Sequence, residues 1–296
     1  MYGNVNLPMP APVSSPSLPS LPTPFTVRSS GLLLHPTSLP GPHGVGDLGA
    51  SARQFVDYLA LAGQTWWQML PIGPVGAGDS PYDSASTLAG SSVLVALEPL
   101  VEVGLLTRDA LRAPRDLAGV RADFSAARAF KEPRLRAAFD KLRASKNKGL
   151  MRRFESFRAE AAPWLEDHAL FIALKAEHGG KHWTQWEPAL RDRKRAALRA
   201  AWERLEDAIT LESFIQWQFT EQWDALRDYG HDRGVQLLGD IPIYVAHDGV
   251  DVWANRDLFE LDGQGERLGL AGCPPDAFTA DGQLWGNPLY RWDVSK

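Results

Sequence analysis

The stretch GLLLHPTSLPGP, residues 31–42, contains a short apolar run followed by a loop rich in proline and glycine. The run extends from Gly31 to His35, and Pro36 closes it. Short apolar runs between turn residues are typical of strands that are buried in a sheet. We therefore predict a buried strand here, and its relation to the next two elements determines the fold.

A helix and a second strand follow this first strand. Residues 51–62 carry apolar side chains at helical spacing, and Gly63 ends the pattern. Residues 65–72, TWWQMLPI, form an aromatic and apolar run that predicts a second strand. A strand, a helix and a strand in this order predict a right-handed crossover between neighbouring strands of a parallel sheet.

The rest of the sequence predicts a helical segment and a third strand. Residues 98–230 have mostly helical patterns, and a stripe of apolar side chains recurs at steps of three and four residues near their end. The stripe consists of Phe219, Trp223, Leu226 and Tyr229. Residues 235–245 predict a third buried strand, which carries Asp240. The remainder is rich in glycine and proline, so we expect loops there and no further strand.

Composition and charge exclude several classes of protein. The net charge of −5 gives no reason to expect nucleic acid or an acidic membrane surface as a partner. Cys273 is the single cysteine, so neither an intrachain disulfide framework nor a cysteine-based zinc cluster is expected. No apolar run reaches the ~18 residues of a spanning helix, and no basic residue precedes Arg28. We therefore expect no membrane span and no secretory signal, which favours the cytoplasm.

The sequence contains no pattern that indicates a cofactor together with the neighbouring residues that the cofactor would need. Residues 44–49 match GxGxxG, but a loop separates them from the strand and no acidic residue stands about 20 positions further on. The seven histidines lack the spacing of metal ligands. Residues 108–158 are basic, which we interpret as solvated helix faces because no aromatic or glycine-rich recognition pattern accompanies them. We expect no cofactor, no metal and no nucleic acid.

Polar and aromatic residues are concentrated where predicted strands end. The groups are Asp79-Ser80-Pro81-Tyr82-Asp83 after the second strand, Asp240 in the third, and Cys273–Phe278 and Trp285–Pro288 after it. If the strands are parallel and barrel-like, all of them lie at the carboxyl ends of the strands. Carboxylates and amides hydrogen-bond hydroxyls while aromatic rings cover C–H faces, so the combination favours a carbohydrate ligand. From spacing alone, Asp240 could equally bond a loop, and Tyr82 could pack in a turn or the core.

At this point five motifs resemble the amylomaltases, the glycoside hydrolase family of 4-α-glucanotransferases. The motifs, in order, are Gly31–Pro42, Trp66–Pro71, Gly78–Tyr82, Gly239–Val245 and Gln283–Tyr290. The similarity extends from about Arg28 to Asp293, which is nearly everything after the proline-rich start.

The resemblance implies an α/β fold of the (β/α)8 TIM-barrel type with a large, mostly helical insertion. The three predicted strands would be the first three of the barrel. The implied division is a proline-rich disordered tail over 1–27, strands one and two with their loops over 28–97, a helical subdomain over 98–230, and strand three with a substrate loop over 231–296.

The resemblance also implies a reaction. A retaining double displacement would transfer α-1,4-glucan segments between maltodextrins, with a carboxylate as nucleophile and the 4-hydroxyl of an acceptor glucan in place of water. Neither a metal nor an organic cofactor would be needed. The sequence makes no prediction of oligomeric state.

Site residues follow from the matching motifs. Tyr82 would stack on the sugar near the scissile bond, with Ser80 in the same loop, and Asp240 would hydrogen-bond sugar hydroxyls.

Two further motifs would line the cleft. Asp276 and Phe278 would lie on the loop that covers it, and Trp285 would shape the acceptor side. Ala77 and Ala277 stand where many members of the family carry tyrosine, so part of the aromatic contact expected there is missing.

The catalytic carboxylates of the family do not match any residue of this sequence. We expect the nucleophile and the acid/base glutamate beyond Lys296, which would make this chain a fragment that is inactive alone. The alternative is a non-catalytic glucan-binding module that keeps the aromatic rim and has lost the chemistry.

Overall fold

The computed structural model describes residues 28–76, 78–114, 117, 121–277 and 279–294. The disordered tail predicted for residues 1–27 lies outside these ranges.

Three short parallel strands form the sheet from which the site loops emerge. They are β1 (Gly31–Leu33), β2 (Trp66–Gln68) and β3 (Gln236–Leu238), in the order β1-β2-β3. The helix α1 (Ala50–Leu61) connects the first two, as the sequence predicts. All three strands are shorter than predicted, because the chain leaves the ladder after three residues at each proline- or glycine-containing loop.

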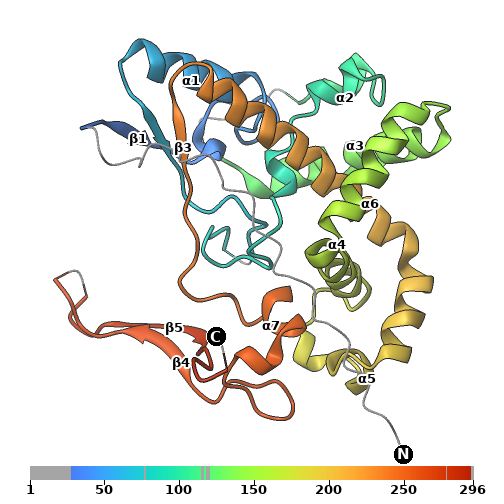
Figure 1. Ribbon diagram of the computed structural model, residues 1–296, viewed down its shortest axis with the longest axis vertical. Coiled ribbons are helices and arrows are strands. Elements are labelled where there is room, and N and C mark those ends of the chain that lie inside the picture. Colours follow the sequence, from blue (N-terminus) through green and yellow to red (C-terminus); the bar gives the residue numbers. More distant parts are fainter. Residues whose placement is uncertain (1–27, 77, 115–116, 118–120, 278, 295–296) are drawn as a thin grey trace, which may run out of the picture.

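One face of this sheet is covered by helices. Leu32, Trp67 and Leu237 are register partners and therefore point to the same face. Trp67 is buried there, with its ring edge-on to Phe55 of α1 at 4.9 Å and its N–H donating to the Leu34 carbonyl at 2.7 Å. Helix α6 lies over the same region, at the top of Figure 1.

The prediction that all three strands are buried is wrong for β1. Its three residues are exposed, and two of the three residues of β3 are only half-buried. Strand β1 stands at the edge with β2 as its single neighbour, and within the described ranges no helix covers the opposite face of the sheet.

Helices dominate the segment between β2 and β3, as predicted. They are η2 (Ser92–Leu94), α2 (Glu98–Glu102), η3 (Arg108–Leu111), α3 (Phe124–Ala144), α4 (Lys148–Glu177), η5 (Trp183–Gln185), α5 (Pro188–Arg191) and α6 (Arg195–His231). Asp123 and Asn147 cap α3 and α4 by accepting hydrogen bonds from first-turn N–H groups.

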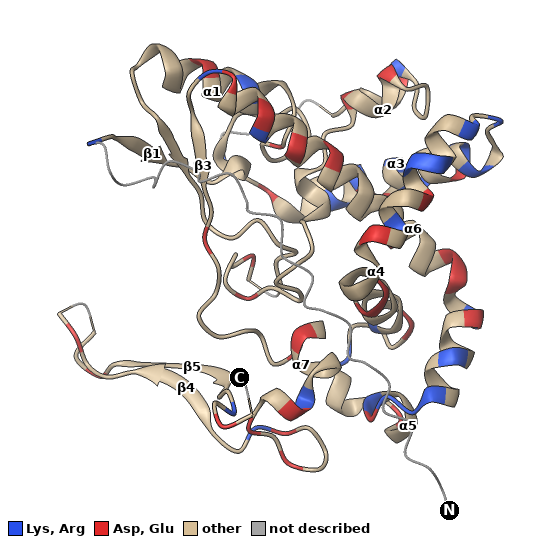
Figure 2. Ribbon diagram, in the orientation of Figure 1, with Lys and Arg blue, Asp and Glu red and all other residues tan. Residues whose placement is uncertain are grey.

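Most basic residues of this segment lie on helix surfaces, as interpreted from the sequence, but Lys131 of α3 is fully buried. Figure 2 shows Lys and Arg positions, in blue, along the ribbon of α3. Arg136 and Arg143 of α3 both form ion pairs with Asp207 of α6, and Arg153 of α4 pairs with Glu221 of the same helix. Most of these side chains are about half exposed, so these are solvated ion pairs.

Two large hydrophobic clusters form most of the core of the described residues, and α6 contributes to both of them. The first contains Trp67, Phe139, Phe154 and Phe214 and supports the sheet. The second contains Phe171, Trp183, Trp186, Ile209 and Trp253 and supports the chain after β3. Since α6 is 37 residues long, it reaches both clusters.

The prediction that no strand follows the third is wrong. Residues after β3 form α7 (Val250–Ala254) and an antiparallel pair of strands, β4 (Leu270–Cys273) and β5 (Gln283–Pro288). Gly272 and Gly286 hide the strand pattern in the sequence. Gly272 pairs with Leu284 at a close backbone approach, since a Cβ on Gly272 would come within 2.4 Å of the Gln283 carbonyl oxygen.

Candidate functional site

A cavity of about 820 Å³ opens between the loop after β2, the loop after β3 and the β4–β5 hairpin. It is lined by Ser80, Tyr82, Asp83, Asp240, Ile241, Pro242, Ile243, Tyr244, Gln283, Trp285 and Asn287. Four of the six residues predicted from the sequence are brought together here: Ser80, Tyr82, Asp240 and Trp285.

Tyr82 and Asp240 form the centre of this site although they stand 158 positions apart in the sequence. The Tyr82 hydroxyl donates to Oδ2 of Asp240 at 2.6 Å, and the Ile241 N–H donates to Oδ1 at 2.8 Å. Asp240 therefore does both things that its sequence context allowed: it bonds its own loop and borders the cavity.

The environment of Tyr82 keeps its hydroxyl protonated. The hydrogen bond to Asp240 is the main cause that raises the pKa of the Tyr82 phenol, and burial adds to it. The side chain is still 44% exposed, so Tyr82 is not packed in the core. Its ring is available to a ligand while its hydroxyl stays oriented by a carboxylate.

Trp285 is presented by β5 on the other side of the cavity. It is 46% exposed, and its N–H donates to the Gln283 side-chain oxygen at 2.9 Å. The hairpin is attached to the loop after β3, because the Asn287 amide donates to the Val245 carbonyl at 2.9 Å. The Tyr244 ring lies 6.2 Å from that of Trp285.

Of the two residues predicted for the covering loop, Asp276 does not line this cavity. Asp276 forms a local turn, in which its Oδ1 accepts from the Thr279 N–H at 2.8 Å and from the Thr279 hydroxyl at 3.2 Å. Phe278 lies outside the described residues.

Sequence reasoning missed four polar or aromatic residues of the cavity: Asp83, Tyr244, Gln283 and Asn287. Gln283 and Asn287 flank Trp285 within one quoted motif, which was a usable signal. Asp83 follows Tyr82 directly, and burial followed by the nearby charge of Asp248 raises the pKa of its carboxyl. The cavity thus holds two carboxyl groups in different environments.

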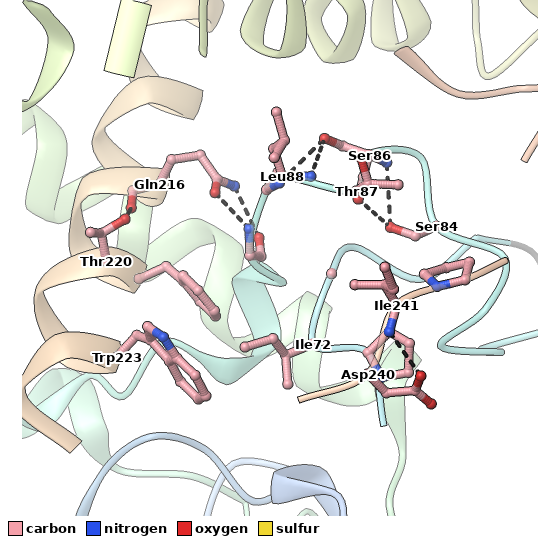
Figure 3. A pocket seen from close by; sticks show the side chains of 16 residues that line it. Ile72, Ser84, Ser86, Thr87, Leu88, Gln216, Thr220, Trp223, Asp240 and Ile241 are labelled. Carbon is pink, nitrogen blue, oxygen red and sulfur yellow. Dashed lines mark hydrogen bonds between the residues drawn. The ribbon is translucent and has the colours of Figure 1, made fainter. Parts of the chain in front are cut away.

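A smaller cavity of about 280 Å³ adjoins the first and shares Asp240, Ile241 and Pro242 with it. Figure 3 shows it between the loop after β2 and α6. Gln216 fixes this loop, because its amide both accepts from the Gly90 N–H at 2.8 Å and donates to the Gly90 carbonyl at 3.0 Å. The loop that carries Ser80 and Tyr82 is therefore anchored to α6 at its far end.

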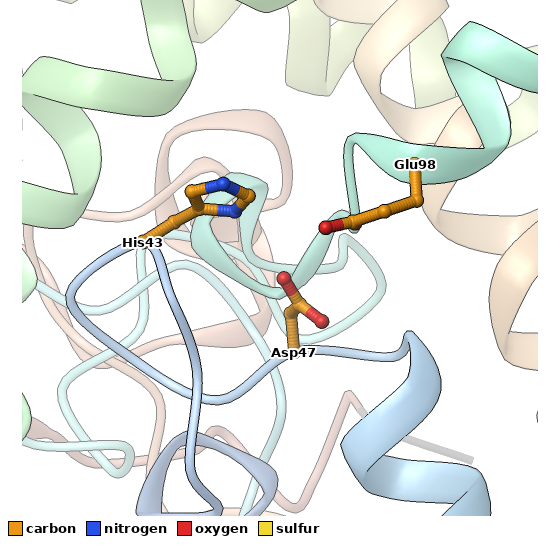
Figure 4. A group of neighbouring side chains, drawn as sticks. All are labelled: His43, Asp47 and Glu98. Carbon is orange, nitrogen blue, oxygen red and sulfur yellow. The ribbon is translucent and has the colours of Figure 1, made fainter. Parts of the chain in front are cut away.

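A third group of side chains has the composition of a metal site. Figure 4 shows His43, Asp47 and Glu98, whose potential ligand atoms lie within 4.8 Å of one another. The buried ammonium group of Lys131 donates to Asp47 Oδ2 at 2.7 Å and to the Val93 and Val95 carbonyls. Burial, and then this positive charge, lowers the pKa of His43. We assign no metal here, because the lysine already supplies the cation.

The parallel sheet and the helices around it define an α/β protein, and comparison with known proteins gives its family. Residues 34–296 match the family model described as 4-alpha-glucanotransferase, so the chain belongs to that family.

Sequence relatives agree with this assignment. The 4-alpha-glucanotransferase of Thermus thermophilus is 46% identical over 267 residues, which cover 90% of this chain and 53% of the relative. The chloroplastic/amyloplastic 4-alpha-glucanotransferase of Solanum tuberosum is 40% identical over 271 residues, covering 90% and 46%. The chain spans about half the length of the curated relatives it matches.

Two solved structures of amylomaltases share the fold of this chain. The amylomaltase from Streptococcus agalactiae in complex with acarbose superposes with a TM-score of 0.85 at 36% identity, covering 90% of this chain and 54% of that chain. The amylomaltase from Corynebacterium glutamicum, at 20% identity and a TM-score of 0.66, agrees in fold. Within the described residues, no helix combines the length and apolarity needed to cross a bilayer.

Proposed function

We propose that the cavity between Tyr82, Asp240 and Trp285 binds α-1,4-glucans and that the chain is the glucan-binding part of an amylomaltase-type 4-α-glucanotransferase. The observation that carries the proposal is the Tyr82–Asp240 hydrogen bond, which orients an exposed ring and a carboxylate into one cavity opposite Trp285. Sugars need this pair of features, because rings cover their C–H faces and carboxylates take their hydroxyl protons.

The finer fold is part of the proposal. We take β1, β2 and β3 as the first three strands of a (β/α)8 barrel and the helices between β2 and β3 as an insertion. The parallel order supports this, and so does the position of the cavity at the carboxyl ends of the strands, where barrel enzymes have their sites.

Each site residue has a proposed task. Tyr82 stacks on the sugar next to the bond that is cleaved, with Ser80 beside it, and Asp240 accepts hydrogen bonds from sugar hydroxyls. Trp285 shapes the acceptor side. Asp276 and Phe278 remain proposed residues of the covering loop.

The transfer itself follows the retaining scheme, in which a carboxylate attacks the anomeric carbon and the acceptor hydroxyl later displaces it. Both oxygens of Asp240 already accept hydrogen bonds from Tyr82 and Ile241, so we give it a binding role. We propose that the nucleophile and the acid/base group lie outside this chain, that no cofactor takes part, and that the protein acts in the cytoplasm.

Isothermal titration with maltotriose and maltoheptaose tests the binding step. We expect Tyr82→Ala and Asp240→Asn each to weaken binding about tenfold or more, since each removes a contact worth ~1.4 kcal/mol or more. The surface change Gln54→Leu on α1 serves as the control. Equal affinity in all four proteins would refute the assignment of the cavity.

The second candidate, a glucan-binding module without chemistry, makes the same binding prediction. It differs in a complementation experiment, in which the chain is mixed with the unmatched half of the Thermus thermophilus relative. Turnover of maltotriose in the mixture favours the transferase, and binding without turnover favours the module.

A further inference from the structure

A separate cavity of about 480 Å³ lies among α1, α2, α4 and α6. It shares no lining residue with the proposed glucan cavity or with its smaller neighbour. Its wall contains apolar side chains, among them Leu48, Leu105 and Leu150, together with several charged and amide groups. Its size falls in the range of small-molecule sites.

Gln218 of α6 lines this cavity and has no hydrogen-bond partner within the described part of the chain, although it is only 7% exposed. The two other buried glutamines of α6 differ. Gln216 pairs with both backbone groups of Gly90, and Gln222 pairs with both backbone groups of Ala96 at 2.7 and 3.0 Å. The Gln218 amide atoms are not among the fully buried atoms without a partner, so they reach open space and offer a donor and an acceptor to a group that occupies the cavity.

The first turn of α1 borders the same space. Gly49, Ala50 and Ser51 line the cavity, and among the described residues no side chain caps this helix, although the Gly49 N–H donates to Asp47 Oδ1 at 3.1 Å. The first N–H groups of a helix have no partner inside the helix and carry a partial positive charge. They therefore offer hydrogen-bond donors to a ligand oxygen next to the Gln218 amide.

The charges around the cavity nearly cancel. Asp47 pairs with Lys131, and Glu221 pairs with Arg153. The remaining charged residues of the lining are Arg53, Glu98 and Glu102, with the helix N-terminus on the positive side. Figure 4 shows the Asp47 and Glu98 carboxylates near each other. Neither a strongly anionic nor a strongly cationic ligand fits this balance, whereas a neutral molecule with many hydroxyls does.

We propose that this cavity binds a neutral polyhydroxylated molecule of mono- or disaccharide size. Its hydroxyls hydrogen-bond the Gln218 amide, the first-turn N–H groups of α1 and the Glu98 and Glu102 carboxylates. Its C–H groups contact the leucine side chains of the wall. The site is distinct from the glucan cavity and does not rest on the proposed function.

Saturation-transfer NMR with glucose and maltose as probes tests the proposal on the 296-residue chain. We expect binding of glucose that weakens about tenfold in Gln218→Leu, the factor expected for the loss of one strong hydrogen bond. Ala225→Trp, at an exposed position of the cavity wall, fills the space without touching the core and has the same effect. Gln54→Leu, the same exchange on α1, leaves binding unchanged.

Asp240→Asn separates this site from the glucan cavity. We expect it to weaken maltotriose binding while the affinity for glucose stays within about twofold. The proposal is overturned if neither glucose nor maltose binds the wild-type chain. It is also overturned if both Gln218→Leu and Ala225→Trp bind as the wild type does, or if Asp240→Asn abolishes glucose binding.

Discussion

On the helical side of the sheet, Trp67 is buried against α1 and α6 contributes Leu226 to the same cluster. On the opposite side, Leu33, Gln68 and Leu238 are register partners, and Leu33 is 55% exposed. Ile241 and Ile243, which continue from β3 into the cavity, are 76% and 78% exposed. The two faces of this small sheet thus differ in cover most clearly at β2, where Trp67 is buried and Gln68 is exposed.

This difference assigns separate roles to the two faces of the sheet. The covered face positions the site loops, and the open face lies next to the cavity. The loops that carry Tyr82 and Asp240 are positioned by the covered face, through the strands and through Gln216. The open face presents apolar side chains next to the cavity, and exposed apolar patches of this kind mark surfaces that meet further protein or ligand. In the proposed barrel, the remaining strands would cover this face.

The largest loss of stability is expected from a substitution that creates a void on the covered face of the sheet. Trp67→Ala should lower the free energy of unfolding by about 4 kcal/mol, because the indole is fully buried and its N–H has a partner. Leu33→Ala, one position away in register on the open face, should cost less than ~1 kcal/mol. Urea unfolding followed by circular dichroism compares the two, and equal losses would contradict the difference between the faces.

A slightly smaller loss is expected for the buried ammonium group on the helical side. Lys131→Met should cost about 3 kcal/mol, because it leaves the Asp47 carboxylate and the Val93 and Val95 carbonyls without their donor. The same unfolding experiment measures it, and the double variant with Asp47→Asn should recover part of the loss. An unchanged free energy of unfolding in Lys131→Met alone would mean that the contacts of Lys131 with Asp47, Val93 and Val95 do not stabilise the fold.

The glutamines of α6 give a comparison within one helix. Gln222→Leu should lower the free energy of unfolding by about 2 kcal/mol, since it leaves the N–H and carbonyl of the buried Ala96 without a hydrogen-bond partner. Gln218→Leu should change stability by less than ~0.5 kcal/mol, because its amide has no protein partner to lose. Thermal unfolding of both variants decides this, and a large loss for Gln218→Leu would reveal a partner.

The smallest change in stability is expected on the open face. Ile243→Ser should alter the free energy of unfolding by less than ~0.5 kcal/mol, since the side chain is mostly exposed. It should nevertheless reduce binding of a hydrophobic dye and the light scattering of concentrated samples. Unchanged dye binding would indicate that this patch is not the exposed apolar surface that the structure shows.

The parallel order of the three strands was predictable because local patterns carry it. Each strand is a short apolar run, and α1 has a clear 3.6-residue period that ends at a glycine. The exposure of β1 was not predictable, because an apolar run has the same pattern whether or not a layer of helices covers it. The β4–β5 hairpin was missed since glycines interrupt both strands, and the hydrogen bond from Asn287 to Val245 that attaches it to the loop after β3 joins residues far apart in the sequence.

The site was partly predictable for a similar reason. Motifs revealed Tyr82, Asp240 and Trp285, each of which stands beside a turn signal. The hydrogen bond between Tyr82 and Asp240 joins residues far apart in sequence and needs the folded sheet. Gln218 carried no signal at all, because one glutamine among three on α6 differs from the others only in what lies opposite it.

The central claim is that this chain binds glucan and that the carboxylates of the reaction come from elsewhere. A disproportionation assay of the purified chain with maltotriose tests it most directly, with glucose and longer maltodextrins as products. We predict that the chain alone releases no glucose, although titration shows maltotriose bound and Tyr82→Ala weakens that binding. Steady glucose release by these 296 residues, lost in Asp240→Asn, would contradict the account and place the reacting carboxylate within this chain.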